Sequence, residues 1–166
     1  RDGAEPQPVG HGVVAADELG PEERRAWYLH ANRVAMEMAT GEARAAGSAV
    51  VLDRSIASTL AFGAAERGAV AAAADVPADF PTPDLIVFLS LPEKIRRRRL
   101  LARDGARTAE EHRLATDDLF RARVLQSYAN LCSAMVDASG PPEEVVGAIL
   151  RLLHTRAGAI RAAGGG

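Results

Sequence analysis

The stretch VVLDRSIASTLAF, from Val50 to Phe62, leads from apolar residues through an Asp-Arg pair into a series with small hydroxyls and one aromatic. With the two residues before it, the segment SAVVLD at 48–53 is short, β-branched and continuous, as in a strand buried on both faces. A helix is expected next, over residues 55–67. A buried strand gains nothing from two charges at its exit, whereas a site that handles phosphate and a divalent metal does. The stretch therefore predicts a parallel α/β unit with a ligand site at the end of its strand.

Two further segments have the composition of strands, and helical segments separate them. DLIVFLS at 84–90 is the clearest strand, and MVDAS at 135–139 is a shorter one. Helical patterns cover residues 21–46, 93–103, 109–134 and 141–156. Strands that alternate with helices predict an α/β domain with a parallel sheet and right-handed crossovers. We expect one domain over residues 1–155 and a frayed tail over residues 156–166.

Composition and charge narrow the range of functions. The 166 residues carry a formal net charge of -2, which gives no general attraction to nucleic acid or to anionic lipid. Cys132 is the only cysteine, so an intramolecular disulfide is excluded and a reducing compartment is favoured. No apolar run approaches the ~20 residues that cross a membrane, and we expect no signal peptide. The expectation is a cytoplasmic protein without nucleic-acid or membrane partners.

The Asp-Arg pair is the first candidate site. Asp53 and Arg54 lie where the expected strand ends, and ligands of parallel α/β sheets bind at that edge. An Asp there can hold Mg²⁺ through its water shell, and an Arg can grip phosphate with two parallel hydrogen bonds. Ser58 and Phe62 are four residues apart and share a helix face, with Thr59 beside them. The alternative is an ordinary helix start, with Asp53 as its N-cap and Arg54 in solvent.

An arginine-rich segment follows the second strand and a Pro-Glu pair. Six arginines lie between Arg96 and Arg107. Arg99 and Arg103 are four residues apart and therefore share a helix face. A basic segment of this kind can close over a triphosphate, neutralise its charge and exclude water, so we expect a lid over residues 96–115. The alternatives are a solvated helix face paired with acidic residues, or a nucleic-acid patch, which the lack of interleaved aromatics disfavours.

Three blocks in register resemble the thymidylate kinase branch of the nucleoside and nucleotide kinases. They are LDRSIASTLAF, PDLIVFLSLPEKIRRRRLLARDG and MVDASGPPEEVVGAIL. That family has an Asp-Arg strand–helix joint, a Pro-Asp-Leu strand, a Pro-Glu turn, an Arg-rich lid and a late short strand. The order and spacing match from about residue 27 to residue 153. The resemblance implies a P-loop NTPase-like three-layer α/β fold that uses ATP and Mg²⁺ to phosphorylate a nucleoside monophosphate. Family members are often dimers, so a homodimer is expected.

The resemblance also implies roles for individual residues. Asp53 would be the metal-associated acid, and Arg54 would hold the acceptor phosphate. The residues that would bind the nucleotide are Arg33, Ser58, Thr59 and Phe62. The lid arginines that would act on the triphosphate are Arg99, Arg103 and Arg107.

The chain departs from the family pattern in several places. Leu29 stands where the family stacks a Phe on the base, Phe62 replaces the usual Tyr, and Ser55 replaces an aromatic. These differences make a deoxynucleoside kinase or another small-molecule kinase the alternative. The sequence has no Gly-x-x-x-x-Gly-Lys-Ser/Thr loop, and Lys94 is its only lysine. We expect the first central strand and this loop to precede Arg1, which would leave the chain as given inactive; the remaining alternative is a non-catalytic binding module.

Overall fold

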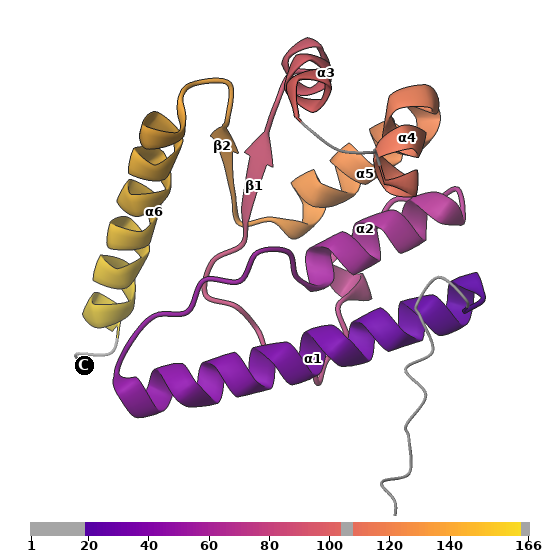
Figure 1. The fold of residues 1–166 in the computed structure, drawn as a ribbon. Helices are drawn as coiled ribbons and strands as arrows, with labels where there is room; N and C mark the ends of the chain where they lie inside the picture. Colours follow the sequence, from indigo (N-terminus) through magenta and orange to yellow (C-terminus); the bar gives the residue numbers. More distant parts are fainter. Residues whose placement is uncertain (1–18, 104–107, 164–166) are drawn as a thin grey trace, which may run out of the picture.

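Helices surround a small parallel sheet in the computed structural model of the chain, which describes residues 19–103 and 108–163 (Figure 1). The elements in chain order are α1 (Pro21–Ala46), α2 (Ile56–Glu66), a 3-10 turn (Ala73–Asp75), β1 (Val87–Ser90), α3 (Glu93–Ala102), α4 (Ala109–Thr116), α5 (Asp118–Leu131), β2 (Ala134–Asp137) and α6 (Pro142–Ala163). This arrangement confirms the α/β class and the parallel sheet. Within the described ranges, no helix is both long enough and apolar enough to cross a membrane.

The sheet consists of β1 and β2, which run parallel and confirm two of the three predicted strands. Val87 lies opposite Ala134, and Ser90 lies opposite Asp137. The backbone N–H of Ala138 extends the pairing by donating to the Ser90 carbonyl at 2.8 Å. Helices α3, α4 and α5 connect the two strands, and α6 packs against β2 on the side away from α5 (Figure 1).

The prediction of a strand at residues 48–53 is wrong. These residues have no regular structure, and among the described residues none pairs with them in a sheet. Val51 is 85% exposed, although its β-branched side chain suggested a buried position. A strand persists only beside a neighbour at about 4.8 Å that takes its backbone hydrogen bonds, and β1 pairs with β2 alone. The sheet is therefore smaller than the sequence suggested.

Two helix predictions also need correction. The helix expected over residues 109–134 is two helices, because Asp117 ends α4 and caps α5. Its carboxylate oxygen accepts the backbone N–H of Phe120 at 2.9 Å, which satisfies one of the open donors at the start of α5. The closing helix α6 continues to Ala163, past Arg156, where we expected it to end. The first helix has the expected bounds, and Gly47 follows it at φ 61, in the left-handed region that commonly ends helices.

Helix α2 is the centre of the hydrophobic core. Ile56 and Leu60 are buried in a cluster that includes Met36 of α1. On the other side of α2, Ala61 and Ala65 are buried against α5; their partners there are Phe120 and Val124. The small alanines let α5 approach closely. Helix α2 is therefore held between α1 and α5 (Figure 1).

Candidate functional site

A cavity of about 480 Å³ lies between α1, α2 and the segment that precedes α2. Its volume is in the range of small-molecule sites. The predicted site residues that line it are Asp53, Arg54, Ser58, Thr59 and Phe62. These five come from one continuous stretch, and the packing of α2 between α1 and α5 presents them to the same space.

Arg54 has an unusual backbone conformation at the edge of this cavity. Its φ of 62° makes it the only non-glycine residue with positive φ in the described part of the chain. The left-handed region costs an L-residue with a Cβ roughly 1–2 kcal/mol, so this conformation lowers the stability of the folded chain. Strain of this kind is concentrated at functional sites in proteins. The Arg54 side chain is exposed and has no hydrogen bond or ion pair with other described residues.

The hydroxyls of Ser58 and Thr59 are oriented by neighbouring helices. The Tyr128 hydroxyl of α5 donates to Ser58 Oγ at 3.0 Å. The side-chain amide of Asn32 in α1 donates to Thr59 Oγ1 at 2.8 Å. Each hydroxyl accepts one hydrogen bond and keeps its own hydrogen for a further acceptor. Both side chains therefore present donors near the cavity.

Phe62 contributes an apolar wall. It is partly buried, lines the cavity and meets Phe120 edge-on, with ring centroids 5.9 Å apart. Tyr128, behind Ser58, stacks on Phe88 of β1 at 5.0 Å. Burial raises the pKa of the Tyr128 phenol, so the group stays protonated and remains a donor to Ser58 at neutral pH. Tyr128 therefore links the cavity residue Ser58 to strand β1 of the sheet.

Arg33 does not line this cavity. Its guanidinium donates to the Asp79 carboxylate at 2.5 Å and to the Asp79 carbonyl at 3.2 Å. It also lies over the ring of Phe80, 5.9 Å from the centroid. The hydrogen bond from Arg33 lowers the pKa of the Asp79 carboxyl. The structure therefore gives Arg33 a partner of its own beside the cavity rather than within it.

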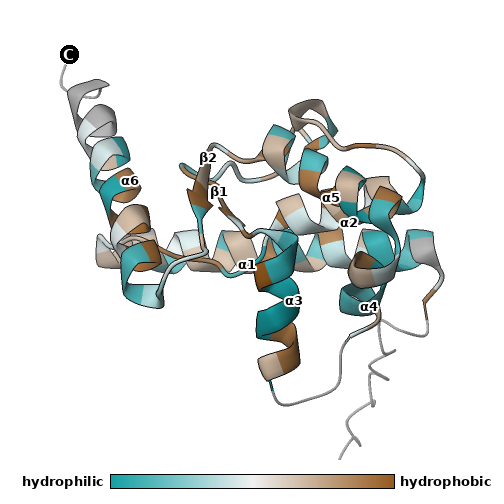
Figure 2. Cartoon of the chain, turned by 90° about the horizontal axis from the view of Figure 1, so that it is seen from above, coloured by the Kyte–Doolittle hydropathy of each residue, from teal (hydrophilic) through white to brown (hydrophobic). Residues whose placement is uncertain are grey.

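The lid arginines also lie away from the cavity. Arg99 donates to three consecutive carbonyls in the turn between β2 and α6, those of Ala138, Ser139 and Gly140, at 2.8, 3.1 and 3.0 Å. Arg103 pairs with Glu111 at 2.8 Å. The prediction for Arg107 lies outside the described residues. Figure 2 shows α3 largely in hydrophilic colours, in agreement with a solvated helix.

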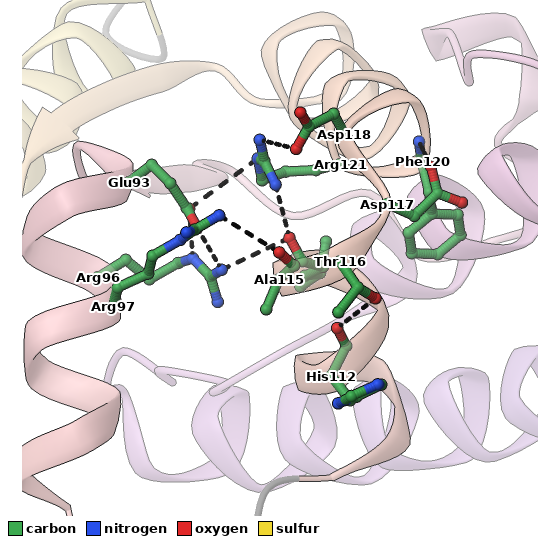
Figure 3. Close-up of polar contacts among 11 residues, drawn as sticks. Glu93, Arg96, Arg97, His112, Ala115, Thr116, Asp117, Asp118, Phe120 and Arg121 are labelled. Atoms are coloured by element: carbon green, nitrogen blue, oxygen red, sulfur yellow. Dashed lines mark hydrogen bonds and ion pairs between the residues drawn. The ribbon is translucent and has the colours of Figure 1, made fainter.

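Glu93 joins α3 to the helices that follow it (Figure 3). Its carboxylate accepts from Arg96 at 2.7 and 2.8 Å and from Arg97 at 2.7 Å. These bonds, the one from Arg96 above all, lower the pKa of the Glu93 carboxyl to about 2 despite partial burial. Arg97 also donates to the Ala115 carbonyl at 3.3 Å, and Arg121 of α5 reaches to 4.0 Å from Glu93. The base of the arginine-rich segment is therefore fixed to α4 and α5.

Sequence reasoning missed the wall that α1 contributes. The α1 residues on this wall include Arg24, Arg25, Trp27 and Tyr28. The spacing of 24, 28, 31 and 35 along α1 places those side chains on one helix face, a signal that the sequence contained. A mixed wall of arginines and aromatics suits a ligand that has both an acceptor-rich and a flat apolar part.

Comparisons with known proteins show which family the chain belongs to. The family model for thymidylate kinase matches residues 13–149, which include the whole cavity. UMP-CMP kinase 2, mitochondrial, from Homo sapiens is 35% identical over 81 residues, covering 47% of this chain and 18% of that protein. The chain thus spans about a fifth of the length of that relative. No solved structure gives a significant match. The family match covers most of the sequence, and the chain belongs to the thymidylate kinase family.

Proposed function

We propose that the cavity between α1 and α2 binds a nucleoside monophosphate, and that the protein transfers the γ-phosphoryl of ATP to it. The observation that carries this proposal is the gathering of Asp53, Arg54, Ser58, Thr59 and Phe62 on one cavity. Family membership and the match to a relative named as a UMP-CMP kinase support it. Phosphoryl transfer asks little covalent chemistry of the protein, because positioning and charge stabilisation supply most of the rate.

Arg54 is the group that we assign to the acceptor phosphate. It is exposed, lines the cavity and forms no ion pair with a described side chain, so its guanidinium is available for a bidentate contact. The hydroxyls of Ser58 and Thr59 have donors to offer a ribose or phosphate oxygen. Phe62 offers an apolar surface to the sugar.

Asp53 is the carboxylate that we assign to Mg²⁺. In the described part of the chain, no group of three or more metal-ligating side chains forms a cage. This fits Mg²⁺, which is commonly held by one or two carboxylates together with waters and substrate phosphates. Bound there, Mg²⁺ would neutralise charge on the transferring phosphoryl group.

The triphosphate side of the reaction needs groups that these residues do not present in the cavity. The sequence has no phosphate loop, and its only lysine, Lys94, lies on α3. We therefore propose that the 166 residues bind the acceptor without transferring phosphoryl by themselves. A lid role for Arg99 and Arg103 would require each to leave its present partner, the turn carbonyls and Glu111. Arg107 keeps its proposed lid role on sequence grounds.

Two alternatives follow from specific observations. Leu29 and Ser55 replace family aromatics, which favours a nucleoside or another small acceptor. The missing phosphate loop favours a non-catalytic binding module. Binding measurements with a panel of nucleosides and nucleoside monophosphates would distinguish the first alternative from the proposed function. A chain that folds without nucleotide and binds no monophosphate would support the second alternative. A homodimer and a cytoplasmic location remain predictions, the first measurable by analytical ultracentrifugation.

Titration of the tryptophan fluorescence tests the proposed function. Trp27 is the only tryptophan and lines the cavity, so a ligand there changes its emission. We expect Arg54→Ala to weaken the binding of monophosphates about tenfold or more, because one charge-assisted contact is lost. The binding of nucleosides, which have no phosphate, should not change. Arg98→Ala is the matched control, because Arg98 is exposed on α3 and outside the cavity. Unchanged monophosphate binding by Arg54→Ala would refute the assignment.

A further inference from the structure

We propose that Glu111 is a switch beside the cavity: while Arg103 holds it, Arg54 is free for a phosphate, and when Arg103 leaves, Glu111 pairs with Arg54 instead. Glu111 and Arg103 are thus positioning residues for Arg54. The inference rests on the proposed function, because it concerns the phosphate that is assigned to Arg54. It gives the arginine-rich segment control over the acceptor site.

Glu111 is held where the end of α3 meets the start of α4. Its carboxylate accepts a hydrogen bond from a terminal nitrogen of Arg103 at 2.8 Å. It also accepts the backbone N–H of Thr108 at 3.0 Å, while the Thr108 hydroxyl accepts the backbone N–H of Glu111 at 3.2 Å. This capping box fixes the backbone of Glu111. Both bonds to the carboxylate end on Oε2, so Oε1 is open to a further donor.

Arg54 is a second cation near this carboxylate. The hydrogen bond from Arg103, followed by that from the Thr108 backbone, lowers the pKa of the Glu111 carboxyl, and the positive charge of Arg54 lowers it further. Arg54 forms no ion pair with a described side chain, so it acts on Glu111 without touching it. Glu110, the neighbour of Glu111 in α4, lines the same cavity as Arg54. The start of α4 therefore lies close to the guanidinium that is assigned to the phosphate.

Arg96 is also near Glu111, but it has a partner of its own. Its guanidinium donates to the Glu93 carboxylate at 2.7 and 2.8 Å. Hydrogen bonding to Glu93 raises the pKa of Arg96, and the charge of Glu111 adds to this effect. Arg54 is exposed and has no such bond to a described side chain. Arg54 is therefore the available partner for Glu111 once Arg103 is gone.

Glu111 and a bound phosphate compete for Arg54. Each is an anion that a guanidinium binds through charge-assisted hydrogen bonds, and Arg54 cannot give the same donors to both. Arg103 prevents this competition by holding Glu111. Ion pairs near the surface are weak, so the two pairings differ little in free energy, as a switch requires. A movement that takes Arg103 away turns Glu111 toward Arg54 and favours release of the phosphate.

Isothermal titration of the 166-residue chain with UMP and with uridine tests this inference. We expect Arg103→Gln to bind UMP about threefold more weakly than wild-type, because Glu111 then occupies Arg54. Uridine, which has no phosphate, should bind both proteins equally. Glu111→Gln should bind UMP at least as tightly as wild-type, and a Gln at this position keeps the capping box. The double variant Arg103→Gln/Glu111→Gln should bind UMP as Glu111→Gln does.

Two variants control for the loss of a charge as such. Arg98→Gln removes a neighbouring exposed arginine of α3. Asp118→Asn removes the acid of the Asp118–Arg121 ion pair at 2.6 Å on α5, outside the cavity. Both should bind UMP as wild-type does.

A pH titration of the Glu111 carboxyl by carbon-13 NMR tests the switch without any ligand. In Arg103→Gln the pKa of Glu111 should stay below its ordinary value, because Arg54 takes the place of Arg103. In Arg103→Gln/Arg54→Ala no arginine is left to do so, and the pKa should rise toward its ordinary value. Equal pKa values in these two variants would overturn the inference, whatever the chain binds.

Two binding results would overturn it as well. Unchanged UMP affinity in Arg103→Gln would show that Glu111 does not compete for Arg54. An equal loss when Arg103→Gln is added to Glu111→Gln would show that Arg103 contacts the phosphate directly. If wild-type protein binds no UMP, or if Arg54→Ala binds it as wild-type does, the proposed function fails, and the titration of Glu111 still decides whether the switch exists.

Discussion

The hydroxyl of Tyr128 donates a hydrogen bond to Ser58 Oγ at 3.0 Å, across a sequence separation of 70 residues. This bond ties α5 to the helix that carries the cavity residues. The same tyrosine stacks on Phe88 of β1, so one side chain links the sheet, α5 and the cavity wall. The position of Ser58 therefore depends on packing far from the cavity.

Tyr128→Phe should remove the hydrogen bond and keep the stacking on Phe88. We expect a loss of about 1 kcal/mol in the free energy of unfolding, the usual net value of one hydrogen bond between neutral groups. Urea unfolding at pH 7 measures it. The chain has one other tyrosine, Tyr28, which is exposed on α1, and Tyr28→Phe should cost close to nothing. Equal losses in the two variants would contradict the prediction.

Glu93→Gln should lower stability in a pH-dependent way. The pKa of the Glu93 carboxyl is about 2 in the folded chain, below its ordinary value of 4.5. The folded protein thus binds this proton more weakly than the unfolded protein does. The stabilisation is fully present above about pH 4.5 and is lost as the pH falls toward 2. We expect Glu93→Gln to cost about 1 kcal/mol at pH 7 and less at pH 3, measured by urea unfolding.

Glu143→Gln is the control for this change. Glu143 lies in the first turn of α6, as Glu93 lies in the first turn of α3. Both substitutions therefore remove the same favourable interaction between a negative charge and a helix N-terminus. Glu143 has no ion pair among the described residues. A pH dependence that is the same in both variants would show that the arginines around Glu93 contribute nothing.

Arg54→Gly should stabilise the chain while it weakens ligand binding. At φ 62° a glycine avoids the steric cost of a Cβ, so we expect a gain of about 1 kcal/mol over Arg54→Ala, which keeps the strain. Thermal unfolding of the two variants measures the difference, and neither should bind monophosphates as wild-type does. If alanine were as stable as glycine, the left-handed conformation of Arg54 would carry no cost.

Arg99→Ala should loosen the turn between β2 and α6. Three carbonyls lose their shared donor, so we expect the amides of Ala138 and Ser139 to exchange hydrogen about tenfold faster. Hydrogen exchange monitored by NMR gives these rates. Arg98→Ala changes the neighbouring arginine without touching the turn, and it should leave the rates as they are.

Local signals in the sequence sufficed for most helix bounds and for two strands. The bounds of α1 follow from acidic residues in its first turn and Gly47 after its end. The break at Asp117 was also readable, because a Thr-Asp-Asp series is typical of a helix start. The segment 48–53 failed because strand formation depends on a neighbouring strand, which local composition does not report.

The candidate site was predictable only in part, for a similar reason. The Asp-Arg stretch is local, and its five predicted residues share the cavity. Helical spacing placed Arg99 and Arg103 on one face, but it could not show that carbonyls and Glu111 take their donors. The approach of Arg25 to Gly63 joins two helices, so it depended on packing that spacing alone does not reveal.

The pairing of β1 with β2 has a consequence for the order of folding. Val87 meets Ala134 only after a long loop that contains α3, α4 and α5 has closed, at an entropic cost of about 3 kcal/mol. Each strand has four residues, so few hydrogen bonds offset this cost. Contacts between residues far apart in the sequence form more slowly than local contacts. We therefore expect β1 and β2 to pair after the helices between them have formed.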